Sequence, residues 1–397
     1  MAGITGGTNR GSVGSVTGHD CAASLIGFAT LATCATSSAL TSVNTNAINS
    51  RHQRHIETSL YVPVSDHTPQ RAAWFPGVIL VNVLAAFIEE RITVHAPRLN
   101  VGDRIGIVSP SDPVREPLLD QYQRGIACLE QMGFRVVAGE HVRSITLGYA
   151  AAAQEKADDI NRMFADPSIR AIICSQGGST ANACLEYLDW DLIRANPKIF
   201  IGISDITVLL NAIYHQTGLV TFHGNDVMWG FGRTPAAYDS EEFTARLVQG
   251  AIGQVRPNGE RHTIRGGAAE GKLLGGNLHC LLKLAGTPYF PDFAGAILFV
   301  EALNITPESC EHLFTQLKHM GIFDQIAGVV IGYIDGLEDA PIQMHDVLLY
   351  VTPGHHFPIL KTRDFGHNCP NTTLPVGARV RIDADSREIE IVEPCVL

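Results

Sequence analysis

From Val101 onward, short runs of β-branched and aliphatic residues alternate with longer amphipathic segments. This alternation is typical of a mostly parallel β-sheet covered by helices. We expect strands at 104–108, 135–137, 171–174 and 199–203 and a helix over about 116–132. Ligands of such sheets bind beyond the carboxyl ends of the strands. A functional site is therefore expected at the loops 175–182 and 204–207.

A second unit begins near Gly266 and is richer in predicted strands. It contains the segment Gly271–Asn277, and strands are expected at 296–300, 328–332, 379–382 and 388–392. A helix is expected over about 307–320. The turn Asp383–Ser386 makes the last two strands a hairpin candidate. The predicted fold class is therefore α/β, with a mostly parallel N-terminal catalytic domain over 96–255 and a smaller β-rich C-terminal domain over 266–397.

Residues 1–95 differ from the rest of the chain. They contain no lysine, five arginines against five acidic residues, and Gly/Ser/Thr-rich text. Such composition packs poorly, so we expect a low-complexity or disordered extension, with a targeting or partner-binding arm as the alternative. The mildly apolar stretch 21–40 lacks the dense basic flank of a signal peptide.

The composition excludes several classes of partner. A formal net charge of −11 with 17% charged residues gives no basic field for nucleic acid or anionic membranes. No apolar run reaches the ~18–20 residues of a membrane helix. None of the nine cysteines falls in a Cys-x-x-Cys or Cys/His spacing typical of zinc. We therefore expect reduced thiols, a cytoplasmic location, and no metal or cofactor.

Ser204 lies where an apolar strand runs into an amphipathic helix, with Gly202 two residues before it. This is the layout of a nucleophile elbow, in which a sharp turn exposes a hydroxyl at a helix N-terminus. The usual Gly-x-Ser-x-Gly pattern is not met, because Ile206 replaces the second glycine. Taken alone, the motif favours a serine that merely caps the helix, a role that serine often fills.

Further blocks follow along the chain: Cys174–Asn182, Tyr187–Lys198, Gly202–Thr207, Thr221–Gly224, Gly271–Leu278, Ile297–Glu301 and Phe365–Gly377. In their residues and their order, these blocks resemble the LD-carboxypeptidase family, and the resemblance spans about Leu99 to the C-terminus. The resemblance implies a two-domain α/β architecture that works as a homodimer without metal. It also implies that Ser204 is the nucleophile, His367 the general base and Glu301 the acid that orients it.

The chemistry of these three residue types agrees with that assignment. A serine hydroxyl becomes a good nucleophile when a neutral imidazole accepts its proton, and a carboxylate fixes the tautomer of that imidazole. His367 lies in a Gly- and Pro-flanked loop, where functional residues are common. Glu301 ends an apolar run, where an unpaired carboxylate would be costly.

The remaining candidate residues concern the oxyanion and the substrate. The backbone N–H groups of Gly178 and Asp205 are the expected oxyanion donors. Asn277 and Trp229 are the expected substrate contacts. Trp229 lies in a Gly-punctuated aromatic segment that could form a flap over the substrate, with packing at the domain junction as the alternative.

Three positions depart from the family pattern and concern substrate choice. Gln176 stands where many members have arginine, Ser179 replaces a common aromatic residue, and Ala302 replaces a usual aspartate. The leading hypothesis is hydrolysis of an amide next to a free carboxylate, by removal of a terminal D-amino acid from murein peptide. The alternatives are a microcin C immunity-type amidase, which cleaves aminoacyl–nucleotide conjugates, and a non-catalytic peptide-binding descendant.

Overall fold

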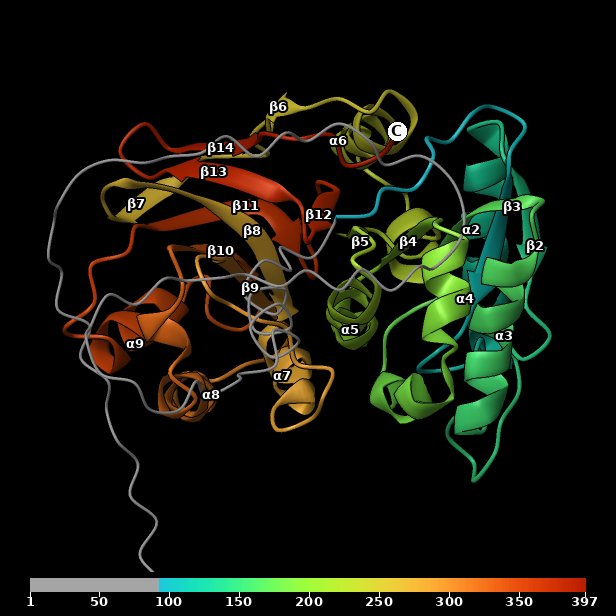
Figure 1. Cartoon of the computed structure of the whole chain (residues 1–397), viewed down its shortest axis with the longest axis horizontal. Coiled ribbons are helices and arrows are strands. Elements are labelled where there is room, and N and C mark those ends of the chain that lie inside the picture. The colour runs from blue at the N-terminus through green and yellow to red at the C-terminus, as the bar shows by residue number, and fades with distance from the viewer. Residues whose placement is uncertain (1–92) are drawn as a thin grey trace, which may run out of the picture. The chain divides into compact units, whose positions relative to one another are not determined.

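The computed structural model describes residues 93–397, which contain two sheets (Figure 1). The first is six-stranded, in the order β12-β5-β4-β3-β1-β2. Its strands are β1 (Arg104–Val108), β2 (Arg135–Ala138), β3 (Ile169–Cys174), β4 (Ile199–Gly202), β5 (Thr221–His223) and β12 (Leu374–Val376). All neighbouring pairs are parallel except β5 and β12. The predicted fold class and the four strands predicted for this sheet, β1 to β4, are confirmed, whereas β5 and β12 were not predicted.

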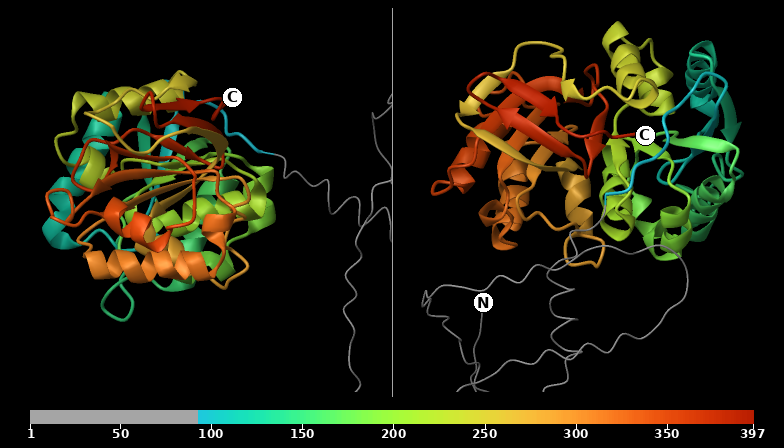
Figure 2. Two further views of the ribbon diagram at one scale, coloured as in Figure 1. Left: turned by 90° about the vertical axis from the view of Figure 1, so that its left-hand side faces the viewer. Right: turned by 45° about the horizontal axis from the view of Figure 1, so that its top comes forward.

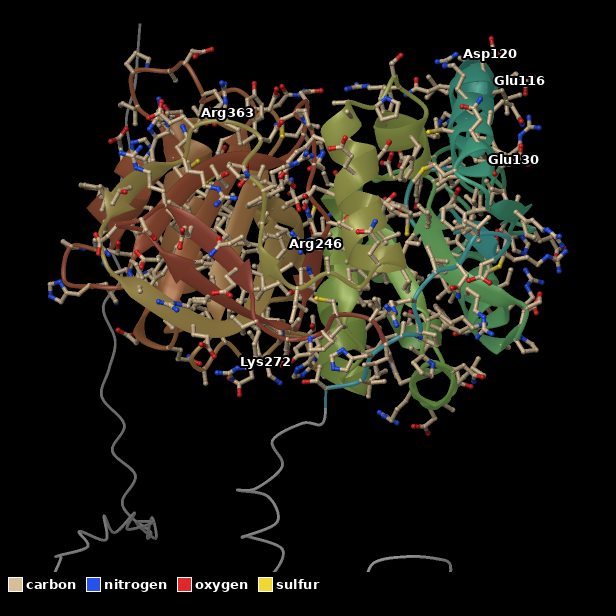
Figure 3. All side chains as sticks on the ribbon, turned by 90° about the horizontal axis from the view of Figure 1, so that it is seen from above. Glu116, Asp120, Glu130, Arg246, Lys272 and Arg363 are labelled. Atoms are coloured by element: carbon tan, nitrogen blue, oxygen red, sulfur yellow. The ribbon has the colours of Figure 1, made fainter. Side chains whose placement is uncertain are left out.

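Helices cover the first sheet because each has an apolar face to bury. They are α2 (Leu119–Gln131), α3 (Ala153–Ala165), α4 (Trp190–Ala195), α5 (Thr207–Thr217) and α6 (Ala237–Phe243). The buried face of α3 includes Ile160, Met163 and Phe164. The exposed face of α2 carries charged residues such as Asp120 and Glu130, which point to solvent (Figure 3). This is the spacing of an amphipathic helix.

Helix α5 is apolar on nearly all sides, because it packs against both sheets. Its Val208, Leu209, Leu210 and Ile213 are fully buried. Asn211 ties it to the second sheet: its Nδ2 donates to the carbonyl of Gly275 at 2.8 Å. The helix that follows Ser204 is therefore anchored in the C-terminal part of the chain.

The second sheet is eight-stranded, in the order β6-β14-β13-β8-β9-β10-β11-β7. Its four middle strands, β8 to β11, run parallel, and helices α8 and α9 lie on one side of them (Figures 1 and 2). The bounds are β6 (Gly253–Gln254), β7 (His262–Arg265), β8 (Ala268–Asn277), β9 (Ile297–Ala302), β10 (Gly328–Ile334), β11 (Ile359–Gly366), β13 (Arg379–Asp383), β14 (Glu388–Ile391), α7 (Leu278–Leu281), α8 (Pro307–His319) and α9 (Met344–Val351). The predicted β13–β14 hairpin is confirmed.

Three strands cross the ranges expected for the two domains. β6 and β7 precede Gly266 yet belong to the second sheet, and β12 follows it yet belongs to the first. β12 pairs antiparallel with β5, with Pro375 opposite Phe222. The pairing covers an otherwise open sheet edge, which is the physical reason for the crossing. The range 1–95 lies, except for its last three residues, outside the described part.

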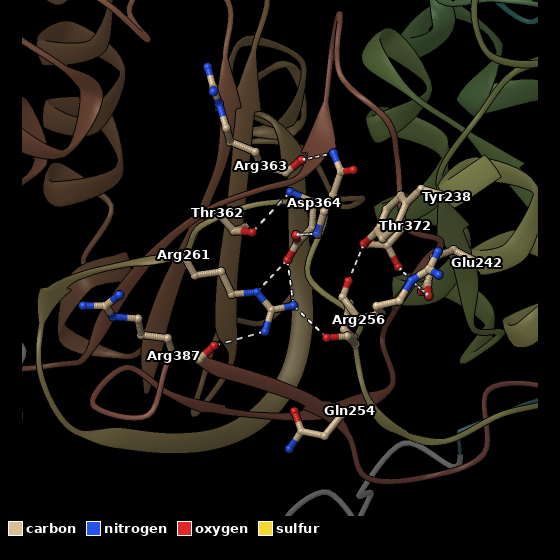
Figure 4. A network of polar contacts seen from close by, with 12 residues as sticks. Tyr238, Glu242, Gln254, Arg256, Arg261, Thr362, Arg363, Asp364, Thr372 and Arg387 are labelled. Carbon is tan, nitrogen blue, oxygen red and sulfur yellow. Dashed lines mark hydrogen bonds and ion pairs between the residues drawn. The ribbon is translucent and has the colours of Figure 1, made fainter. Parts of the chain in front are cut away.

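A polar network joins the end of β11 and the loop after it to segments that pack around them (Figure 4). The part of the chain built on the six-stranded sheet is called the first, or N-terminal, lobe, and the part built on the eight-stranded sheet the second, or C-terminal, lobe. In the second lobe, the buried guanidinium of Arg261 donates from Nε to Asp364 Oδ2 at 2.8 Å. Towards the first lobe, Thr372 Oγ1 donates to Glu242 Oε2 of α6 at 2.7 Å. Buried ion pairs of this kind stabilise little in net terms, but they fix one arrangement because breaking them is costly. The loop between residues 366 and 373 is thus held at both ends.

Candidate active site

Ser204 follows β4 and begins a 3-10 turn, Ser204–Ile206, that leads into α5. Its φ is +65°, in the left-handed region that non-glycine residues rarely adopt. Such strain is typical of functional turns. The cap positions before the 3-10 turn and before α5 are Ile203 and Ile206. The alternative in which Ser204 simply caps a helix therefore does not hold.

The loop after β3 runs directly against Ser204. A Cβ placed on Gly177 would lie 2.6 Å from the Cβ of Ser204, 2.8 Å from its Oγ and 3.3 Å from the backbone nitrogen of Asp205. The approach requires glycine, because real Cβ atoms do not come this close. The turn and the Gly177–Gly178 loop therefore form one wall.

His367 and Glu301 form a hydrogen-bonded pair at the carboxyl ends of parallel strands. His367 follows β11, Glu301 lies in β9, and His367 Nδ1 is 2.5 Å from Glu301 Oε2. Glu301 is fully buried, and the His367 side chain is 15% exposed. This contact leaves Nε2 of His367 as the nitrogen available to a substrate or nucleophile.

Each partner shifts the pKa of the other. Burial alone would lower the pKa of His367, but the Glu301 charge and its hydrogen bond outweigh burial and raise this pKa above its usual value. Burial alone would raise the pKa of Glu301, but the imidazolium and its hydrogen bond lower it. The pair thus favours a carboxylate that stabilises a protonated imidazole.

Ser204 and His367 line the same cavity, whose volume is about 800 Å³. Its walls come from the carboxyl ends of strands in both sheets, as expected for parallel sheets. The lining includes Asp112, Gln176, Gly177, Gly178, Ser204, Asn225, Asp226, Trp229, Arg233, Asp239, His367, Asn368 and Asn371. The two lobes therefore contribute jointly to one site.

Family models match both lobes in sequence. The model described as the LD-carboxypeptidase N-terminal domain matches residues 105–224, and the one described as the LD-carboxypeptidase C-terminal domain matches residues 270–382. The chain belongs to the LD-carboxypeptidase family. This is a family of serine carboxypeptidases, and the match confirms the resemblance inferred from the sequence blocks.

Individual members of the LD-carboxypeptidase family cover most of the chain. The Microcin C7 self-immunity protein MccF of Escherichia coli is 32% identical over 77% of this chain and 97% of its own length. The probable murein peptide carboxypeptidase of Bacillus subtilis is 30% identical over 72% of this chain and 90% of its own. The structure of MccF with aspartyl sulfamoyl adenosine has a TM-score of 0.72 at 31% identity, covering 77% of this chain and all (100%) of MccF.

The structure brings several of the sequence-predicted LD-carboxypeptidase site residues to the cavity. Gly178, at φ +144°, and Trp229 line it together with Ser204 and His367. Asp205 follows Ser204, but its side chain is fully buried behind the wall. Asn277 is not part of the lining: it stands opposite Glu301 in the β8–β9 register, and its Oδ1 accepts the N–H of Cys280 at the start of α7.

Trp229 is held by neighbours in a short π-helical turn, Val227–Phe231. Its ring N–H donates to Gln176 Oε1 at 3.0 Å, and the Arg233 guanidinium lies 4.9 Å from its ring centroid. The side chain remains 42% exposed. Phe231, in contrast, is buried and packs edge-on against Phe243. The two aromatic residues of this segment therefore have different surroundings, and Gln176 supports the tryptophan.

Two charged residues of the cavity, Asp226 and Arg233, were given no role in the prediction from sequence. Asp226 is buried, which raises its pKa to about 6, although the N–H groups of Trp229 and Gly230 bind it. Among the described lining residues, Arg233 has the permanently positive side chain. The sequence feature that could have indicated a role for Arg233 in the site is its position in the Gly-punctuated segment after Trp229. Within residues 93–397, no group of three or more His, Cys, Asp or Glu side chains is arranged to hold a metal ion.

Proposed function

We propose that Ser204, His367 and Glu301 are a catalytic triad. The proposal is carried by one observation: a serine with φ +65° at a strand–helix junction shares a cavity with a histidine whose Nδ1 is bound to a buried carboxylate. Nε2 of His367 accepts the Ser204 proton as Oγ attacks the scissile carbonyl carbon. Glu301 stabilises the resulting imidazolium.

The tetrahedral intermediate places a negative oxygen near the Gly177–Gly178 loop. The backbone N–H groups of Gly178 and Asp205 are the proposed donors to this oxyanion. Collapse of the intermediate breaks the amide C–N bond, and His367 gives its proton to the leaving amine. Water then attacks the acyl-enzyme while His367 takes its proton. His367 returns that proton to Ser204 Oγ as the acyl C–O bond breaks, which regenerates the free serine.

We propose that the amide cleaved lies next to a free carboxylate, in a murein-type peptide ending in a D-amino acid. The LD-carboxypeptidase family and the murein peptide carboxypeptidase relative support this substrate class. Arg233 at the cavity wall supplies a guanidinium that could pair with the terminal carboxylate. The cavity also contains Asp112, Asp226 and Asp239, which disfavour a second carboxylate near them.

A second candidate is the amidase reaction of microcin immunity, favoured by the half-exposed ring of Trp229 on the cavity wall. A flat indole can stack on a nucleobase. MccF, a relative of comparable identity, has been crystallised with an aminoacyl sulfamoyl nucleoside. Both candidates use the same triad and differ in the leaving group.

The deciding experiment compares two substrates, a murein tetrapeptide and an aspartyl sulfamoyl adenosine, with wild-type protein and Ser204→Ala. Loss of a triad serine leaves residual catalysis by the oxyanion hole and binding, so we expect turnover to fall at least several hundredfold, on the order of 10³, with the fold intact by circular dichroism. Near-normal activity of the variant would refute the triad. Absence of turnover by wild-type protein on both substrates would favour a non-catalytic peptide-binding descendant.

We further propose that the protein is cytoplasmic and acts as a homodimer. The free state of the described cysteines, five of the seven of them buried, suits a reducing compartment. The homodimer rests on the family resemblance. Separately, no helix within residues 93–397 is long and apolar enough to cross a membrane. Fractionation of the source cells and sedimentation of the purified protein test the two proposals.

A further inference from the structure

A buried carboxylate lies directly behind the nucleophile turn. The side chain of Asp205, the residue after Ser204, is fully buried. Its Oδ2 accepts hydrogen bonds from Ser111 Oγ at 2.6 Å and from the backbone N–H of Ala181 at 2.8 Å. Its Oδ1 is paired with the ammonium of Lys283 at 2.5 Å. The carboxylate is thus bound on both oxygens, and the mechanism proposed above assigns it no chemical step.

Lys283 approaches this carboxylate from the other lobe. It lies in the 3-10 turn Leu282–Leu284 that follows α7, and its side chain is 27% exposed. The same ammonium donates to the backbone carbonyl of Ser179 at 3.0 Å. One side chain of the C-terminal lobe therefore binds both the residue after the nucleophile and the residue after Gly178.

The other side-chain hydrogen bonds to the loop that contains Gly177 and Gly178 come from the N-terminal lobe. Thr180 donates its N–H to Ser111 Oγ at 3.2 Å, and Lys156 of α3 donates to Thr180 Oγ1 at 2.5 Å. These contacts hold the loop against its own sheet. Among the hydrogen bonds described for the loop residues 177–181, the bond from Lys283 is the one that reaches them from the lobe that carries Glu301 and His367.

Lys283 is also connected to the strand that carries Glu301. The turn containing Lys283 follows α7, which begins immediately after Asn277, and Asn277 pairs with Glu301 between β8 and β9. A short, hydrogen-bonded path therefore runs from the acid of the proposed triad to the nucleophile turn. Since the nucleophile and the base lie in different lobes, their relative position depends on ties of this kind.

We propose that Lys283 is a positioning residue that fixes the oxyanion donors relative to the His367–Glu301 pair. The inference rests on the proposed function, because the donors are the N–H groups of Asp205 and Gly178. Lys283 binds the side chain of the first and the carbonyl that follows the second. Loss of its charge would leave the buried Asp205 carboxylate with two neutral donors, and the turn would shift to rehydrate it.

The test uses Lys283→Met in the full chain, with Lys283→Arg as the conservative variant and Lys272→Met as the matched control. Lys272, labelled in Figure 3, lies on β8, where its ammonium stands 5.4 Å from the Tyr214 ring. It is not among the residues that line the cavity. Misplacement by up to about 1 Å costs up to ~10²-fold in rate. For Lys283→Met we therefore expect kcat to fall about 10- to 100-fold with KM within about twofold of wild type.

Lys283→Arg should recover most of kcat, since it restores a cation to Asp205, and Lys272→Met should retain wild-type kcat. The acid limb of the pH profile should stay in place in Lys283→Met, because Lys283 does not contact His367. Unchanged kcat in Lys283→Met, or a loss of kcat that equals the loss of folded protein by near-ultraviolet circular dichroism, would overturn the inference. If Ser204→Ala remains active, the proposed function fails; if Ser204→Ala is inactive while Lys283→Met is unimpaired, this inference fails alone.

Discussion

Gly177→Ala adds a single methyl group at the point where the loop after β3 meets Ser204, the proposed nucleophile. Gly177 is not among the residues with positive φ, so its backbone accepts alanine. The new Cβ would stand 2.6 Å from the Cβ of Ser204, whereas carbon atoms in contact prefer about 3.5–4.0 Å. Relief of the overlap requires a displacement of about 1 Å, shared between the loop and Ser204.

A displacement of about 1 Å in a reacting group costs on the order of 10²-fold in rate, or about 2.7 kcal/mol of activation free energy. We therefore expect Gly177→Ala to lower kcat about 100-fold on the substrate that wild type turns over, measured by release of the amine. Labelling of Ser204 by a fluorophosphonate should slow in parallel, because the probe reacts with the same hydroxyl.

The matched control is Gly259→Ala, since a Cβ there meets no atom within 4 Å and its φ is not positive. This variant should retain wild-type kcat and labelling rate. The thermal midpoint of Gly177→Ala distinguishes misplacement from unfolding. Wild-type kcat in a folded Gly177→Ala protein would show that the close approach to Ser204 does not matter for the chemistry.

The remaining predictions concern pH, specificity and stability. The raised pKa of His367 should place the midpoint of the acid limb of kcat/KM above the usual value of ~6.5, since the base must be neutral, and Glu301→Gln should move that midpoint to lower pH; an unmoved limb would contradict the pairing. If the nucleotide reaction is the true one, Trp229→Ala should weaken kcat/KM for the sulfamoyl adenosine by ~1–3 kcal/mol and leave a murein tetrapeptide nearly unchanged, and equal losses on both would assign the ring to packing. Asp364→Ala, which leaves the buried Arg261 unpaired, should destabilise the protein by about 3–5 kcal/mol, seen as a lower urea midpoint; an unchanged midpoint would argue against that network.

The backbone of the site was predictable because its signals are local. The apolar run before Ser204 and the helix after it are contiguous in sequence, and the structure gives Ser204 the strained φ of a tight turn. Glu301 stood out as a polar residue at the end of an apolar run, and His367 as a residue of a Gly- and Pro-flanked loop. Their pairing was expected from the family resemblance together with triad chemistry, and the structure places them in hydrogen-bond contact.

The side-chain contacts behind the site were not predictable from one sequence. Lys283 and Asp205 are separated by 78 positions, and no periodicity relates them. Lys283 is a single lysine in a mostly apolar stretch, which makes it a candidate for an ion pair. The sequence does not indicate which carboxylate it would bind. Asn277 was expected to contact the substrate, and the structure shows it beside Glu301 as the cap of α7. Its contact with a substrate stays a prediction.

The crossing of β12 into the first sheet has a consequence for the order of folding. The edge of β5 is completed by residues 374–376, which follow nearly all of the second sheet along the chain. During synthesis, the N-terminal sheet therefore waits with an open edge until this segment has emerged from the ribosome. The same segment follows the His367 loop directly, so a nascent chain acquires its histidine in place at the moment its first sheet closes. If His367 is the proposed base, partial translation products that lack it should be inactive, and their bare β5 edge is where chaperones or misassembly would act.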